Sequence, residues 1–448
     1  MKKFFKVAGI AVIIALLYSS FTTYPKLDLI SGFSAKSIAS GHFIDNRSQE
    51  MIESGDNDID LIDLAKNTIN ESSKFATASV YGLKERKAIF REGLGATLIN
   101  DEFDESKPYL VPKRTMLNNN LPFPYGNLEA KDTIFNDIDY TKLNVAVANA
   151  FDKKGKMDKR TRSLLVIYKD KIIAEKYDVG FNKESKILGW SMTKSITSAM
   201  FGILEKQGKI NIYASAPIPE WANDERKNIT TNDLLHMNSG LEWEEKYDKI
   251  CDATEMLFQA EDMTRSQLVK KAVYKPNTHW NYSSGTTNLL SGILRKQFKT
   301  HQEYLDFWYA SLIDKIGMNS MILETDMTGN YVGSSYGWAT TRDWSKFGLL
   351  YLHKGNWNGE QIFNESWVKY TATPTNTSNG DYGGHFWLNS GGKFPDVPRD
   401  MYYCGGFQGQ MVVIIPSLDL VIVRMGLKEN PEFDFNEMFK GIIGSLKK

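Results

Sequence analysis

A serine and a lysine three residues apart, Ser191 and Lys194, open an amphipathic stretch of the chain in the segment GWSMTKSIT. Residues three apart on a helix lie on the same face, so the lysine amine can reach the serine hydroxyl. The partial positive charge of a helix N-terminus favours a neutral amine, and its unpaired backbone N–H groups can stabilise an oxyanion. The pair predicts a serine nucleophile with a lysine as its base.

Spacing alone does not single out this serine, because a solvated polar pair explains most copies of Ser-x-x-Lys. Three further copies begin at Ser366, Ser390 and Ser445. Behind Ser191, apolar residues recur at helical spacing over residues 196–204, until Gly208 ends the run. The prediction of a nucleophile therefore attaches to Ser191.

A tyrosine further along the chain, Tyr282, stands in the segment NYSSGTTNLLSGIL. Here, as at Ser191, the chain resembles class C beta-lactamases and their esterase and amidase relatives, which have Tyr-x-Asn or a close variant at this point. The resemblance implies that Tyr282 passes a proton between the nucleophile, Lys194 and the leaving group. Without Ser191 upstream, a core aromatic with a satisfied hydroxyl would be the first explanation of Tyr282.

The third resemblance lies in YYCGGFQGQ, where lactamases have Lys-Thr-Gly and this chain has a Cys-Gly-Gly triplet. It implies that the backbone N–H of the next residue, Phe407, is an oxyanion donor beside that of Ser191. Glycines let the backbone approach a substrate closely, although a Gly-rich strand edge is also typical of a β-bulge. The candidates for the substrate pocket are Ser284, Cys404, Gly405 and Gly406.

Two more segments extend the resemblance over roughly residues 140–448. TTNDLLHMNSGLEW matches the family's Leu-Leu-x-x-x-Ser-Gly-Leu stretch, and YGWATTRDWSKFGLL resembles its segment with an Asp-x-x-x-Phe-Gly run. We expect His236 and Trp243, in the first of these, to be structural. Five ordered segments are far more specific than any one motif.

Two departures from the lactamase pattern change the expected substrate. Cys404 replaces the lysine that meets a β-lactam carboxylate, and Ser284 replaces the usual asparagine. The pattern Gly-x-x-Gly-Gln, residues 406–410, is similar to that of the nylon-oligomer (aminohexanoate-dimer) hydrolases and related esterases. The resemblance therefore implies a linear amide or ester, small molecule or peptide, cleaved through an acyl-enzyme.

The resemblance to this penicillin-recognising superfamily implies an α/β (α+β) fold, with an antiparallel sheet flanked by helices plus a mostly helical subdomain. No metal or organic cofactor is needed. Two alternatives stay open: a D-alanyl carboxypeptidase or β-lactamase, and a catalytically silent protein that binds cell-wall fragments. The missing lysine at Cys404 counts against the first, and the intact Ser-Lys-Tyr set counts against the second.

Sequence patterns divide the chain into three parts. Residues 1–24 place three lysines ahead of an apolar run without a good cleavage site, which favours a signal anchor over a removed signal peptide. Residues 25–140 are an N-terminal extension of unknown role, in which residues 76–100 predict two strands joined by a charged turn. Residues 141–448 are the hydrolase domain, whose early and late strands complete one sheet around a helical region.

Composition narrows the partners and the compartment. Fifty-four basic and 54 acidic residues give no reason to expect nucleic acid as a partner. Either a disulfide or two thiols fits Cys251 and Cys404, and the scattered histidines, with no HExxH, predict no metal site. The N-terminal lysines predict an inner-membrane anchor with the hydrolase facing the periplasm, or export to the periplasm or exterior if the signal is cleaved.

Overall fold

The computed structural model describes residues 2–428 and 432–447. A six-stranded antiparallel sheet, in the order β12-β13-β14-β15-β5-β6, forms its centre. The strands are β5 (Thr161–Tyr168), β6 (Lys171–Tyr177), β12 (Trp387–Leu388), β13 (Tyr402–Gly406), β14 (Gln410–Ile415) and β15 (Leu420–Gly426). Because β15 pairs with β5, the two ends of the hydrolase part complete one sheet, as the sequence predicts.

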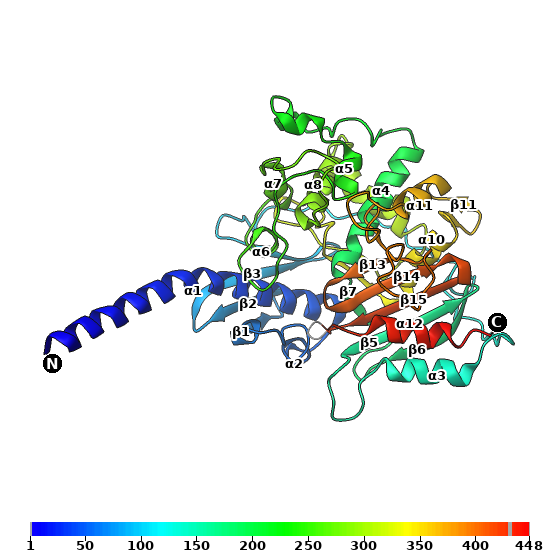
Figure 1. Cartoon of the computed structure of the whole chain (residues 1–448), viewed down its shortest axis with the longest axis horizontal. Helices are drawn as coiled ribbons and strands as arrows, with labels where there is room; N and C mark the ends of the chain where they lie inside the picture. The colour runs from blue at the N-terminus through cyan, green and yellow to red at the C-terminus, as the bar shows by residue number, and fades with distance from the viewer. Residues whose placement is uncertain (1, 429–431, 448) are drawn as a thin grey trace.

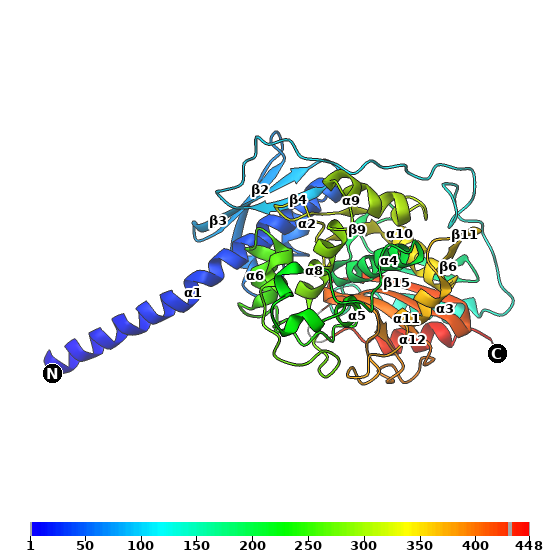
Figure 2. The same ribbon diagram turned by 90° about the horizontal axis from the view of Figure 1, so that it is seen from above.

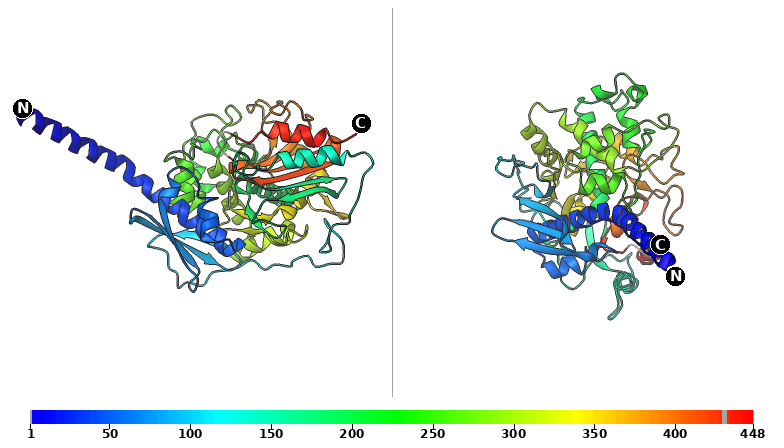
Figure 3. Two further views of the ribbon diagram at one scale, coloured as in Figure 1. Left: turned by 90° about the horizontal axis from the view of Figure 1, so that it is seen from below. Right: turned by 90° about the vertical axis from the view of Figure 1, so that its left-hand side faces the viewer.

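The middle strands are apolar on both faces because both faces of the sheet are covered. Val412 and Ile414 of β14 belong to the larger apolar core, whereas Val413 and Ile415 belong to a second core on the opposite face. α3 (Tyr140–Asn149) and α12 (Phe435–Ile443) pack side by side over the second core (Figure 3). The opposite face packs against α4 (Thr193–Lys206) and α10 (Thr341–Leu352).

A mostly helical part lies beyond α4, above the sheet in Figure 1, with α3 and α12 below; Figure 2 looks down on it from above. It contains α5 (Thr231–Leu235), α6 (Asp252–Phe258), α7 (Met263–Leu268), α8 (Ser284–Arg295) and α9 (His301–Trp308). Smaller elements complete the hydrolase part: β7 (Lys186–Leu188), β8 (Ile322–Leu323), β9 (Gly337–Thr340), β10 (Asn356–Trp357), β11 (Glu360–Gln361) and α11 (Glu365–Thr371). The predicted antiparallel sheet with flanking helices and a helical subdomain is thereby confirmed.

The N-terminal extension is more regular than its sequence indicates. One long helix projects from the body and then packs along a four-stranded sheet (Figure 1). Its elements are α1 (Lys2–Asp45), α2 (Gln49–Glu53), β1 (Ala65–Asn70), β2 (Phe75–Val80), β3 (Leu83–Arg91) and β4 (Gly95–Ile99). The prediction of a charged turn within residues 76–100 is wrong. The charged residues 84–87 belong to strand β3, and the turn before this strand lies at Tyr81 and Gly82.

A buried ion pair joins this extension to the hydrolase part. Lys36 of α1 donates to Glu324 at 2.6 Å, and both side chains are almost fully buried. Glu324 also accepts from the indole of Trp338 at 2.9 Å and from the backbone of Ala96 in β4 at 2.8 Å. Because a buried charge without its partner is costly, this network fixes α1 against the hydrolase part.

The structure bears on two further predictions, the membrane anchor and the state of the two cysteines. Among the residues that the structure describes, no helix is both long enough and apolar enough to cross a membrane. Membrane attachment through the N-terminal segment gains no support from this finding and stays a prediction. Cys251 and Cys404 are both free and buried, so of the two explanations for the cysteines the structure shows two thiols.

Candidate active site

A tight turn presents Ser191 at the N-terminus of α4. The turn is a short 3₁₀ helix, Trp190–Met192, held by a hydrogen bond from the Gly189 N–H to the Gly337 carbonyl at 2.8 Å. Trp190, directly before the serine, has φ +48°, which is a left-handed conformation that costs free energy for any residue other than glycine. Strain of this kind persists only where the surrounding structure fixes the backbone. The backbone that leads into the nucleophile is therefore held in one conformation.

The Lys194 side chain points at this serine from the first turn of α4. Its Nζ donates to the Ser191 Oγ at 3.0 Å, to the Ser284 Oγ at 2.9 Å and to the Ser334 carbonyl at 3.0 Å. An ammonium has three N–H groups, so these three acceptors satisfy it completely. Lys194 is 1% exposed, which makes it a buried amine in contact with a partly exposed serine.

Burial lowers the pKa of Lys194 to about 8, because the low-dielectric interior disfavours the ammonium form, and the charge of Glu245 opposes this shift. The sequence predicts a lowered pKa from the helix N-terminus, whereas the structure shows that burial is the main cause. A base that is half neutral near pH 8 suits proton abstraction from a serine.

Tyr282 contacts the nucleophile from the loop before α8. Its hydroxyl is hydrogen-bonded to the Ser191 side chain, and its ring centroid is 4.9 Å from the Lys194 Nζ. The ring stacks on Trp387 with 5.2 Å between centroids. Burial raises the pKa of Tyr282 far above its usual range, so at neutral pH the side chain is a phenol that can donate a proton. Ser191, Lys194 and Tyr282, which the sequence singles out separately, thus meet in one site.

The third motif lies on β13, whose end approaches the Ser191 turn. A Cβ on Gly406 would meet the Gly189 carbonyl oxygen at 2.2 Å, so the two backbones could not approach this closely with any larger residue. Phe407 follows, and its ring contacts Trp190 with 5.6 Å between centroids. Gly405 and Gly406 are partly exposed, and the close approach of Gly406 to Gly189 brings the end of β13 against the turn that carries Ser191.

Cys404 does not line the site in the way that its place in the motif predicts. The residue is 1% exposed and belongs to the apolar core. Burial raises the pKa of the Cys404 thiol to about 12, while a hydrogen bond with Ser195 lowers it. A neutral thiol beneath the site has no charge to offer a substrate.

Ser284 is also not a pocket residue, because it is fully buried as the first residue of α8. Its Oγ accepts from Lys194 and donates to Glu245, and its backbone N–H donates to the same carboxylate at 2.9 Å. Glu245 does not stand out in the sequence as a site residue. The only hint in the sequence is its position two residues after Trp243, at the end of the stretch that resembles the family.

The two residues expected to be structural hold neighbouring loops. His236 bonds to the Thr375 Oγ1 at 2.7 Å, and burial lowers the pKa of His236 to about 4. Trp243 is buried, and its indole N–H donates to Glu245 at 2.5 Å. These bonds connect both side chains to residues other than Ser191 and Lys194, in keeping with supporting roles.

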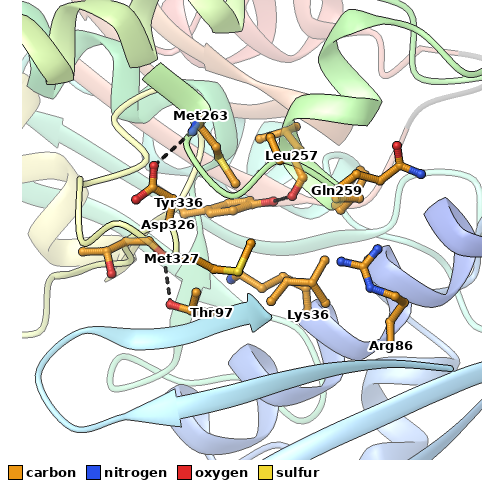
Figure 4. Close-up of a pocket in the computed structure, with 13 residues that line it drawn as sticks. Lys36, Arg86, Thr97, Leu257, Gln259, Met263, Asp326, Met327 and Tyr336 are labelled. Atoms are coloured by element: carbon orange, nitrogen blue, oxygen red, sulfur yellow. Dashed lines mark hydrogen bonds between the residues drawn. The ribbon is translucent and has the colours of Figure 1, made fainter. Parts of the chain in front are cut away.

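A separate pocket lies where the extension meets the helical part (Figure 4). Lys36, Arg86 and Thr97 line it from the extension, and Met263 and Asp326 line it from the hydrolase part. Ser191, Lys194 and Tyr282 are not among the residues that line this pocket. The pocket therefore belongs to the interface between the extension and the hydrolase part.

Such a fold with a serine, a buried lysine and a tyrosine in contact defines a serine hydrolase of the penicillin-recognising superfamily. A model of the beta-lactamase family matches residues 148–444, which is more than half of the chain. The chain therefore belongs to the beta-lactamase family.

Solved structures share this fold at low sequence identity. A Bacillus anthracis protein described as a 6-aminohexanoate-dimer hydrolase is 21% identical, with a TM-score of 0.56 over 64% of this chain and 78% of its own. A family VIII carboxylesterase is 15% identical, with a TM-score of 0.56 over 71% of this chain and 99% of its own. A class C beta-lactamase is 14% identical, with a TM-score of 0.53 over 70% of this chain and 99% of its own.

The pKa of Lys194 predicts the pH dependence of hydrolysis. Because the amine must be neutral to accept the serine proton, kcat/KM should rise with pH through a midpoint near 8 and fall about tenfold per pH unit well below it. Initial rates on p-nitrophenyl butyrate between pH 5.5 and 9.5, corrected for spontaneous hydrolysis, measure this acid limb. A rate that is constant from pH 6 to 9 would contradict a base with this pKa.

Proposed function

We propose that this serine hydrolase cleaves an uncharged linear ester or amide through an acyl-enzyme on Ser191. The observation that carries the proposal is the pair of contacts at the nucleophile: the Lys194 Nζ lies 3.0 Å from the Ser191 Oγ, and the Tyr282 hydroxyl is bonded to the same side chain. Lys194 takes the serine proton as the hydroxyl attacks the carbonyl carbon. Tyr282 then delivers a proton to the leaving group and regains one from the protonated Lys194 beside it, and water releases the acyl group.

The developing oxyanion needs donors on the opposite side of the carbonyl from Lys194. We assign this role to the backbone N–H groups of Ser191 and Phe407, whose chain segments meet at Gly189 and Gly406. Each such donor contributes about 3–4 kcal/mol to transition-state stabilisation in enzymes where it has been removed.

The surroundings of the nucleophile favour an apolar substrate. Aromatic rings gather near Ser191. Phe407 contacts both Trp190 and Tyr247, with 5.6 and 5.4 Å between ring centroids, and Trp387 stacks on Tyr282. Aromatic side chains supply large apolar contact area to a bound group. The names of two similar structures, a 6-aminohexanoate-dimer hydrolase and a carboxylesterase, agree with amide or ester cleavage.

The alternative is a β-lactamase or D-alanyl carboxypeptidase, whose substrates carry a carboxylate. Lys393 supports this alternative, because its Nζ lies 5.9 Å from the centroid of the Trp387 ring and its side chain is exposed. Against it stands Cys404, which is buried and neutral where a lactamase has a lysine.

We predict weak turnover of β-lactams relative to esters. A charge-assisted hydrogen bond to the substrate carboxylate is worth about 1.5–3 kcal/mol, which corresponds to roughly one to two powers of ten in rate. The test compares kcat/KM for p-nitrophenyl butyrate and nitrocefin on the purified protein. A nitrocefin value equal to the ester value or above it would favour the lactamase. Loss of nitrocefin turnover in Lys393→Ala would then identify Lys393 as the cation that replaces the lactamase lysine.

We also propose that residues 1–24 hold the protein at a membrane, with the hydrolase outside the cytoplasm. The proposal rests on Lys2, Lys3 and Lys6 ahead of the apolar run over residues 7–18. Cell fractionation should place the full-length chain in the membrane pellet, with an intact N-terminus in the mass spectrum. Recovery of a soluble form that starts near residues 20 to 40 would show a cleaved signal peptide instead.

A further inference from the structure

Glu245 lies in the loop between α5 and α6, where its carboxylate accepts four hydrogen bonds. One oxygen accepts from the Ser284 hydroxyl and from the Tyr247 hydroxyl, the latter at 2.6 Å. The other accepts from the Ser284 backbone N–H at 2.9 Å and from the Trp243 indole at 2.5 Å. A carboxylate bonded to this extent has one orientation, and its position at the N-terminus of α8 is favourable for a negative charge.

This carboxylate connects to the base through a single hydroxyl. Lys194 donates to the Ser284 Oγ at 2.9 Å, and the Ser284 Oγ–H donates onward to Glu245. Ser284 is fully buried, so no water competes for either bond. The direction of the hydroxyl is therefore set by the carboxylate, which leaves the oxygen lone pair turned toward Lys194.

The other titratable side chains that face Lys194 carry no charge near neutral pH. Tyr282, from the loop before α8, remains a phenol because burial raises its pKa. His385, from the loop before β12, is neutral because burial lowers its pKa to about 3. Its Nε2 is bonded to the Thr287 Oγ1 at 2.9 Å and its Nδ1 to the Leu235 carbonyl at 2.6 Å. Among the described residues, Glu245 is thus the negative charge that acts on Lys194.

We propose that Glu245 is a positioning residue of this hydrolase, which orients Lys194 through the hydroxyl of Ser284 and supplies the negative charge that the lysine faces. The inference rests on the proposed function, because it assigns Lys194 the role of base. Two consequences follow. The charge raises the pH at which Lys194 becomes neutral, and the hydroxyl bridge keeps the amine aimed at Ser191.

Glu245→Gln removes the charge and keeps the size of the side chain. Its kcat/KM on p-nitrophenyl butyrate should rise at a lower pH than in the wild type, with the acid limb displaced by about one pH unit. The matched control is Glu244→Gln, one residue earlier, where the side chain is partly exposed and pairs with Lys249 at 2.5 Å. The control should keep the wild-type pH profile, and thermal melts of both proteins verify folding.

Ser284→Ala tests the bridge independently of the charge. It removes the shared hydroxyl and leaves Glu245 in place, so kcat should fall at least about tenfold while KM changes little. Wild-type kcat in Ser284→Ala, or an acid limb in folded Glu245→Gln that coincides with that of the wild type, would overturn the inference. Failure of the proposed function is a separate result, because the wild-type protein would then show no ester or amide hydrolysis at any pH.

Discussion

The burial of the Lys194 amine is the constraint on which the rest of the site depends. A primary amine loses its hydration when it is buried, and the lowered pKa that follows makes it a base near neutral pH. The same burial would be costly without partners, and the structure supplies one acceptor for each N–H, from Ser191, Ser284 and Ser334. The same three acceptors thus make the buried amine tolerable for folding and hold it in place for catalysis.

The elements around the site hold the amine in this way by converging on the start of α4. The large apolar core holds α4 against the central sheet, the end of β13 approaches the turn before Ser191, and α8 brings Ser284 beneath the amine. The extension joins from a further side: Phe33 of α1 stacks on Trp190, with 6.1 Å between ring centroids. A helix that begins far from the hydrolase part therefore packs against the residue that precedes the nucleophile.

Much of this arrangement is accessible from the sequence because it rests on local patterns. The Ser191 helix has helical periodicity and β14 and β15 are short, continuous apolar runs, while the family resemblance predicts the roles of Tyr282 and Phe407. Glu245 escapes such reasoning, because its partner Ser284 is 39 residues away in the chain. A single carboxylate in a loop carries no pattern.

Two other differences also have physical causes. Neighbouring side chains on a strand point to opposite faces of the sheet, so those of Tyr403 and Cys404 enter different apolar cores. The motif match predicts the position of the Cys404 backbone in the strand but not the burial of its side chain. The regular structure of residues 25–100 depends on contacts with α6 and with Glu324, which lie far away in the sequence. Tertiary contacts of this kind override weak local propensity.

The mechanism requires Ser191 to be the nucleophile, and covalent labelling tests this requirement most directly. The purified protein is treated with a fluorophosphonate probe and digested, and the modified peptide is identified by mass spectrometry. We predict one adduct, on the peptide that contains Ser191, its absence in Ser191→Ala, and unchanged labelling in Ser366→Ala, which alters another Ser-x-x-Lys copy. Labelling that persists in a folded Ser191→Ala protein, or ester hydrolysis within tenfold of wild type in that variant, would contradict the account.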